Sequence, residues 1–154
     1  MPKQLLLIAH TPSPNLKAMA EAVCSGAADP MVTEVETSLL PPLEASSEDV
    51  LRADAVILLT PENLGYMSGA LKDFFDRSYY DLLDQTDALA FAMVIRAGND
   101  GTGTRRAIQS ICGGLKWNAV QAPLICRGQW QSRFLDDCRE LGMTLALGLQ
   151  EGLF

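Results

Sequence analysis

Three runs made almost entirely of apolar residues limit the fold of this chain more than any other feature. They span residues 5–9, 55–60 and 89–97. Strands that are buried on both faces of a parallel sheet have this pattern, whereas strands with one wet face alternate. Elsewhere, apolar residues recur at helical spacing, in residues 16–27, 67–78, 108–115 and 134–149. This alternation of strands and helices predicts an α/β fold built on a parallel sheet.

Two weaker strand segments indicate the order of the strands. Residues 31–37 are rich in β-formers but polar and alternating, and residues 117–126 contain Pro123, which cannot donate to a central ladder. Both segments are therefore expected at the sheet edges. With right-handed crossovers, we predict a doubly wound three-layer sandwich with a five-stranded parallel sheet in the order 2-1-3-4-5. A short helix is expected to start at Ser46 and end at Arg52.

Length, charge and cysteine content narrow the class of protein. The 154 residues predict a single domain over residues 1–154. The 12 basic residues are scattered and the net charge is −7, which argues against nucleic acid as a partner. The four cysteines lack metal-ligand spacing, so no metal site is expected. The first apolar run is too short for a secretory signal, and none is long enough for a membrane span, so we expect a cytoplasmic protein.

The predicted strand order also predicts where a ligand binds. In the order 2-1-3-4-5 the chain reverses direction between strands one and three, and ligands bind beyond the carboxyl ends of the strands at such a point. The loops that follow strands one, three and four there are residues 10–15, 61–68 and 98–104. We expect the functional site among these three loops.

The first loop has the donors for an anion at the start of a helix. Thr11 and Ser13 supply hydroxyl groups and Asn15 an amide, and no basic residue precedes Lys17. The free N–H groups and dipole of a helix N-terminus favour negative charge. A phosphate held by neutral donors fits a nucleotide monophosphate better than a triphosphate. The alternative is plain helix capping by Ser13, with Pro14 in the first turn.

The second and third loops are rich in residues that shape turns. In the second loop, Pro61, Gly65 and Gly69 predict a turn that exposes backbone groups to a flat ligand, although an ordinary turn capped by Ser68 is the alternative. Residues 98–103 contain three glycines, which permit close backbone approach to a ligand. Their spacing, G-x-x-G-x-G, differs from the dinucleotide fingerprint.

Motifs in the first two loops resemble those of the flavodoxin-like superfamily, in particular its small NAD(P)H-dependent FMN reductases and quinone reductases. The stretch Thr11-x-Ser13-x-Asn15 resembles the flavodoxin phosphate loop. The run from Pro61 to Asp73 resembles the Pro-Glu segment of the family, which lies against the flavin ring and leads into the third helix. The second motif is the more specific, and the likeness covers essentially the whole chain.

The resemblance implies an FMN site that is shared among the three loops. The first loop would hold the phosphate, through Thr11, Ser13, Asn15 and Leu16. The second and third loops would flank the isoalloxazine, through Pro61, Glu62, Asn63, Leu64, Gly65, Tyr66, Met67, Gly98, Asn99, Gly101 and Gly103. NAD(P)H would be the co-substrate, and Arg105 and Arg106 either meet its phosphate or lie in solvent.

Three functions remain open. The first is an oxidoreductase that passes reducing equivalents from NAD(P)H through FMN to a quinone, flavin or similar acceptor. It needs no catalytic side chain, because the flavin does the redox chemistry. The second is a flavodoxin-type electron carrier. The third is a flavodoxin-like module with weak or no flavin binding, because Pro12 and Pro14 lack N–H groups and Leu16 replaces a hydroxyl residue. Reductases of this type often dimerise through the third helix, so a homodimer is expected there.

Overall fold

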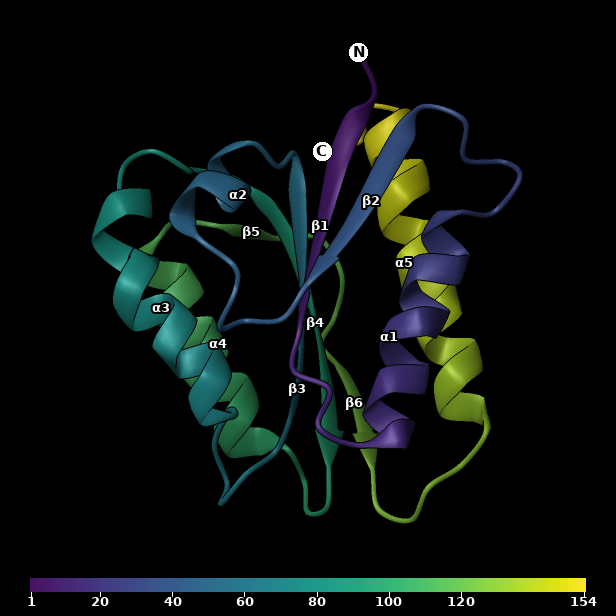
Figure 1. Cartoon of the computed structure of the whole chain (residues 1–154), viewed down its shortest axis with the longest axis vertical. Helices are drawn as coiled ribbons and strands as arrows, with labels where there is room; N and C mark the ends of the chain where they lie inside the picture. Colours follow the sequence, from purple (N-terminus) through teal and green to yellow (C-terminus); the bar gives the residue numbers. More distant parts are fainter.

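Strands and helices alternate along the chain in the computed structural model, which describes residues 1–154 (Figure 1). The elements are β1 (Lys3–Ala9), α1 (Pro14–Ala27), β2 (Val35–Leu40), α2 (Ser47–Leu51), β3 (Ala55–Pro61), α3 (Gly69–Leu82), β4 (Ala90–Ala97), α4 (Thr102–Gly114), β5 (Asn118–Ala119), β6 (Leu124–Arg127) and α5 (Arg133–Gln150). The strands form one parallel sheet in the order β2-β1-β3-β4-β5, and β6 also pairs with β4. The predicted fold class and strand order are confirmed.

The last predicted strand is divided into two, so the sheet has six strands where five were predicted. β5 pairs with Ala90 and Phe91, whereas β6 pairs with residues 94–97 on the same side of β4. The backbone N–H of Val120 still donates to the Phe91 carbonyl, over 3.1 Å. Pro123, just before β6, has no N–H to continue the ladder, so the strand is interrupted there.

The second strand begins four residues later than predicted, at Val35. The residues before it are bonded elsewhere: the N–H groups of Thr33 and Glu34 donate to the Gln150 side-chain oxygen at the end of α5, over 2.7 and 3.0 Å. The short helix is present as α2. It begins with a capping box in which Ser46 and Asp49 exchange hydrogen bonds.

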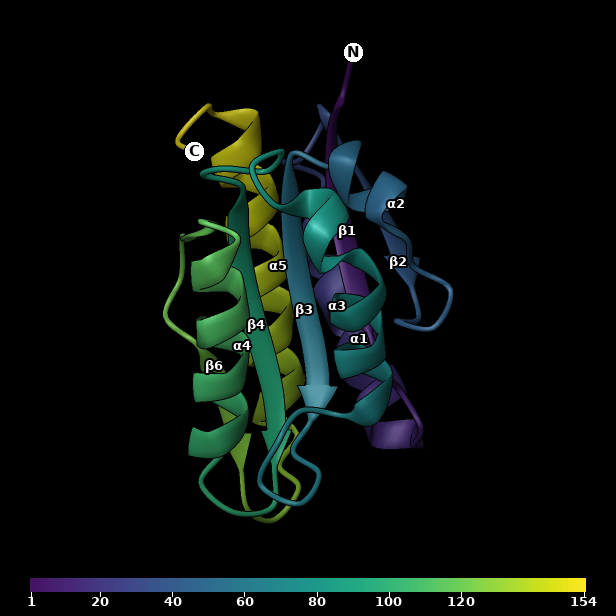
Figure 2. The ribbon, with the colours of Figure 1, turned by 90° about the vertical axis from the view of Figure 1, so that its left-hand side faces the viewer.

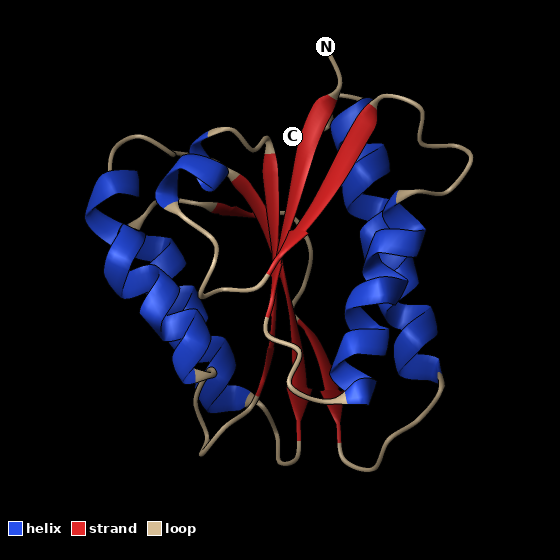
Figure 3. Cartoon of the chain, in the orientation of Figure 1, coloured by secondary structure: helices blue, strands red, loops and turns tan.

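Helices cover both faces of the sheet, with α1 and α5 on one side and α2, α3 and α4 on the other (Figure 3). Side chains along β1 divide between the two cores. Leu5 and Leu7 belong to the cluster under α1 and α5, and Leu6 and Ile8 to the cluster under α3 and α4. Because both faces are dry, each central strand is apolar along most of its length.

The loops after β1, β3, β4 and β6 all lie at one end of the sheet, at the bottom of Figures 1 and 2. This arrangement follows from the parallel strands, whose carboxyl ends share one edge. The three predicted loops therefore lie close together in space. No helix of the chain combines the length and the apolar character needed to cross a membrane.

Candidate functional site

The first loop is held at both ends. The N–H of His10 donates to the Leu59 carbonyl over 3.0 Å, which ties the end of β1 to β3. At the other end, Ser13 Oγ accepts the Leu16 N–H over 3.3 Å and begins α1, with Pro14 as its first residue. The capping role of Ser13 is therefore present. The side chain of Leu16 is buried in the core, so its backbone alone can face the loop.

Three backbone donors in this loop have no acceptor within the protein. The N–H groups of Thr11, Ser13 and Asn15 donate a hydrogen bond to no atom of the protein. They lie around the start of a 14-residue helix, whose N-terminus carries partial positive charge. Pro12 and Pro14 add no donors. This neutral donor set still fits a phosphate group, because backbone N–H groups at a helix start suffice to bind one.

The base of the second loop is fixed by buried hydroxyl groups. Thr60 Oγ1 donates to the Pro61 carbonyl over 2.9 Å and accepts the Ser68 N–H over 3.0 Å. Ser68 Oγ in turn accepts the Leu71 N–H over 3.2 Å and begins α3. Met67 is also buried. The loop therefore starts and ends at rigid positions, with residues 62–66 projecting between them.

The tip of the second loop is a tight hairpin. Asn63 and Tyr66 exchange two backbone hydrogen bonds of 2.8 and 2.9 Å. Leu64 and Gly65 between them have φ angles of +52° and +75°, as a two-residue type I′ turn requires. Leu64 is unusual in this conformation and its side chain is fully exposed.

Glu62 joins the second loop to the third. One carboxylate oxygen accepts the Asn99 N–H and the other accepts the Gly101 N–H, each over 2.9 Å. The third loop is also held from β6, since Arg127 Nε donates to the Asp100 carbonyl over 2.9 Å. The Glu62 carboxylate therefore binds backbone N–H groups of the third loop.

Two glycines of the third loop allow close contact between that loop and other parts of the chain. A Cβ on Gly103 would lie 2.0 Å from the Gly65 carbonyl oxygen, so the hairpin rests directly on the first turn of α4. Gly101 has a φ of +70°, and a Cβ there would lie 2.7 Å from a methyl group of Ile125. A Cβ on Gly98 would meet nothing within 4 Å. Of the three predicted glycines, Gly98 alone is free of such packing.

Sequence reasoning missed a fourth loop, which follows β6. Arg96, at the end of β4, donates to the carbonyls of Ala97, Cys126 and Gly128 over 3.0, 3.0 and 2.7 Å. Its guanidinium also lies 5.1 Å from the Phe134 ring centre and 5.8 Å from that of Trp130. One signal was available in the sequence, a single arginine near the end of an apolar strand.

Several basic side chains lie near the loop end of the sheet, although the chain as a whole is acidic. They include Lys17, Arg105, Arg106 and Arg127. The acidic residues of the three loops, Glu62 and Asp100, both accept backbone N–H groups. The Thr102 N–H bond is the main cause that lowers the pKa of Asp100. Burial lowers the pKa of His10, which keeps that ring neutral near pH 7.

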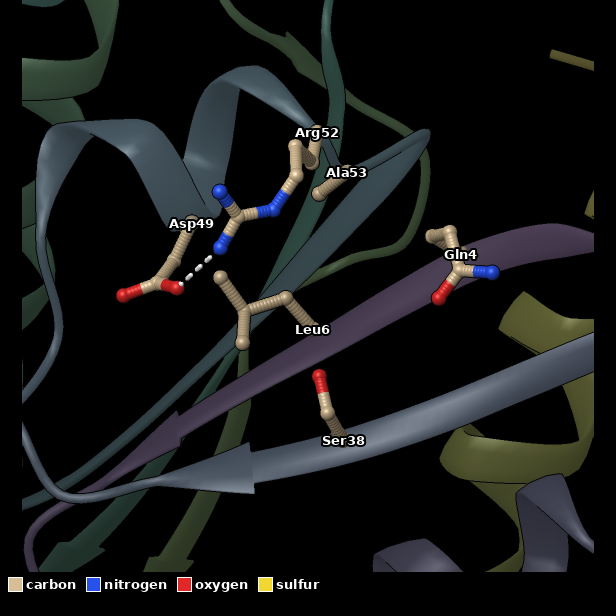
Figure 4. A pocket seen from close by; sticks show the side chains of 6 residues that line it. All are labelled: Gln4, Leu6, Ser38, Asp49, Arg52 and Ala53. Atoms are coloured by element: carbon tan, nitrogen blue, oxygen red, sulfur yellow. Dashed lines mark hydrogen bonds and ion pairs between the residues drawn. The ribbon is translucent and has the colours of Figure 1, made fainter.

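The site is a surface formed by loops, because the four cavities of the molecule lie elsewhere. One cavity of about 400 Å³ lies beside β1, β2 and α2, toward the amino end of β1 (Figure 4). Arg52 and Asp49 form an ion pair of 2.8 Å on its wall, so their charges offset each other. None of its lining residues belongs to the three loops.

The fold and these loops define a flavodoxin-like protein, and comparison with known proteins identifies its family. The sequence profile of the NADPH-dependent FMN reductases matches residues 10–131, a range that includes all three loops. The chain belongs to this family. The resemblance predicted from the loop motifs is confirmed, and FMN is the flavin for which the family is named.

Comparisons with individual proteins are consistent with this family. A protein named flavodoxin from Aquifex aeolicus (strain VF5) is 36% identical over 108 residues, which are 70% of this chain and 57% of that relative. The match thus spans little more than half of the relative. Among solved structures, a flavodoxin from the domain Archaea has a TM-score of 0.80 at 17% identity and covers 96% of this chain and 99% of its own. The WrbA-like protein from Agrobacterium tumefaciens has a TM-score of 0.70 at 16% identity, covering 98% and 99%. These two show the shared fold.

Proposed function

We propose that this chain binds FMN with its phosphate at the first loop and its isoalloxazine against the second and third loops. The observation that carries the proposal is the set of free N–H groups of Thr11, Ser13 and Asn15 at the start of α1. The flavin ring then meets the hairpin tip, where Leu64 and Tyr66 offer exposed apolar surface. In this proposal Gly98 and Asn99 of the third loop lie on the other side of the ring.

In this proposal the residues of the chain bind the flavin and orient it. When bound, FMN supplies the chemistry, accepting two electrons from a reduced nicotinamide and passing them to an acceptor. The N–H groups of the first loop fix the phosphate end, and the dipole of α1 favours its charge. The hairpin is held at its base by Thr60 and Ser68 and would hold Leu64 against the ring and exclude water there.

We propose further that the protein is an NAD(P)H-dependent reductase whose acceptor is a quinone, a flavin or a similar small molecule. The family description, which names NADPH, supports this activity. The position of Arg105 and Arg106 supports it too, because basic side chains at the start of α4 suit a phosphate-bearing nicotinamide. A flavodoxin-type electron carrier is the second candidate, since a relative at 36% identity is named flavodoxin.

Stopped-flow spectroscopy of the FMN-loaded protein separates the two candidates. A reductase bleaches its flavin absorbance when mixed anaerobically with NADPH or NADH, and a quinone then restores the absorbance with steady turnover. A carrier is reduced by dithionite but not by either nicotinamide. A protein that binds no FMN would contradict both candidates.

Two further proposals concern the assembly and the cell compartment. We propose a homodimer through the groove between α3 and α4, where Tyr80 is 84% exposed and stacks edge-on against Tyr79. The groove holds about 240 Å³. Sedimentation of the wild type and Tyr80→Ser tests this: the variant is expected to be monomeric, and a monomeric wild type would contradict it. All four cysteines are free thiols, which supports a reducing compartment such as the cytoplasm.

A further inference from the structure

The third loop contains an anion site that the protein fills with its own side chain. The N–H groups of Asn99 and Gly101 both point at the Glu62 carboxylate, and each bond is 2.9 Å long. The two N–H groups are separated by one residue, Asp100, and converge on the two oxygens of the same carboxylate. Backbone N–H groups that converge in this way form a nest that binds anions. In this chain the anion is Glu62.

The backbone of Glu62 places its carboxylate over this nest. Its N–H donates to the Arg96 carbonyl over 2.8 Å and so extends the pairing of β3 and β4 by one residue beyond Pro61. The side chain then reaches across to the loop that leaves β4. A few residues further, the Gly65 carbonyl rests on Gly103. The second and third loops are thus joined at two points and form one surface.

We propose that Glu62 is a positioning residue that fixes the third loop against the second and sets the direction in which a phosphate-bearing flavin binds. A phosphate at the third loop would meet a carboxylate already bonded to both donors, and the two negative charges repel. The free donors of the first loop carry no such competitor. FMN therefore places its phosphate at the first loop and its uncharged ring at the joined loops. This inference rests on the proposed FMN site.

Two substitutions at Glu62 and one control test the nest without any flavin. Glu62→Gln keeps the shape of the side chain. Its NH₂ group is a donor that faces one of the two N–H donors, so at least one hydrogen bond is lost. Glu62→Ala empties the nest. Glu44→Gln removes the same charge from an exposed carboxylate on the loop after β2, which makes no side-chain hydrogen bond. NMR measures the exchange of the Asn99 and Gly101 amide protons with water in each variant.

Hydrogen bonds to charged groups are strong enough that losing one is expected to speed exchange of these two amides about tenfold in Glu62→Gln. Glu44→Gln should leave them unchanged. Inorganic phosphate should shift the Asn99 and Gly101 resonances in Glu62→Ala but not in the wild type, a response that lost loop packing alone does not produce. Unchanged exchange in Glu62→Gln, or equal phosphate shifts in wild type and Glu62→Ala, would overturn the role of Glu62.

Flavin binding then tests the consequence for the ligand. In Glu62→Gln the dissociation constant of FMN is expected to rise about tenfold, since the ring then meets a loop that is no longer fixed. The Glu44→Gln control should bind FMN as the wild type does. Equal FMN affinity in Glu62→Gln and the wild type would overturn the positioning role. A wild type that binds no FMN would instead contradict the proposed function, while the amide measurements would still decide whether Glu62 fills the nest.

Discussion

Replacing Gly103 by alanine tests whether the hairpin of the second loop rests on α4. A Cβ at this position would lie 2.0 Å from the Gly65 carbonyl oxygen, well below the closest approach of about 3 Å, so the hairpin must move by about 1 Å. Such overpacking costs about 1–3 kcal/mol. Alanine normally gains about 0.5–1 kcal/mol over glycine in a helix. The steric cost outweighs this gain, so Gly103→Ala is expected to lower the free energy of unfolding.

Gly113 provides a matched control on the same helix, since a Cβ there meets nothing within 4 Å. Gly113→Ala should therefore show the propensity gain alone. In a chain of this size 1 kcal/mol shifts Tm by about 2–4 °C. Calorimetry should find a lower Tm for Gly103→Ala and a higher Tm for Gly113→Ala. If both variants melt above the wild type, the contact between the hairpin and α4 does not exist as described.

Three other predictions follow from buried or partly buried groups. Thr60→Val leaves the Ser68 N–H without its acceptor and should cost about 1–3 kcal/mol in urea unfolding, whereas a loss below 0.5 kcal/mol would contradict the bond. Burial lowers the pKa of His10, so unfolding stability should fall as pH drops below 6.5, and His10→Gln should remove that part of the fall. Cys24 is half-buried whereas Cys112, Cys126 and Cys138 are buried, so maleimide should label Cys24 in the native protein first; equal rates would refute this.

The arrangement of the strands could be predicted because the burial of a strand determines which of its residues are apolar. Leu5 to Ala9 face two cores in turn, and a strand with two dry faces has a continuous apolar pattern. The position of the loops followed from the strand order alone. The division of the last strand was harder to foresee. Pro123 indicated an edge, but a proline does not say whether the strand ends there or resumes after it.

The detailed contacts of the loops lay outside what the sequence could predict. Glu62 bonds to residues 37 and 39 positions away, and a single sequence shows no trace of such pairing. The glycines of the third loop were predicted to permit close approach to a ligand, whereas the close neighbour at Gly103 is the protein's own backbone and Gly98 has none within 4 Å. Leu16 and Met67 were predicted at the site, and their side chains are buried in the two cores. Their roles toward a flavin stay predictions.

The central claim is that the free N–H groups of the first loop hold the phosphate of FMN. A parallel fluorescence titration of the purified protein with FMN and with riboflavin, which lacks the phosphate, tests it most directly. Saturable binding of FMN, at least tenfold tighter than that of riboflavin, is the predicted result, since each 1.4 kcal/mol of phosphate binding is worth about tenfold. Equal affinity for the two flavins, or no binding of either, would contradict it.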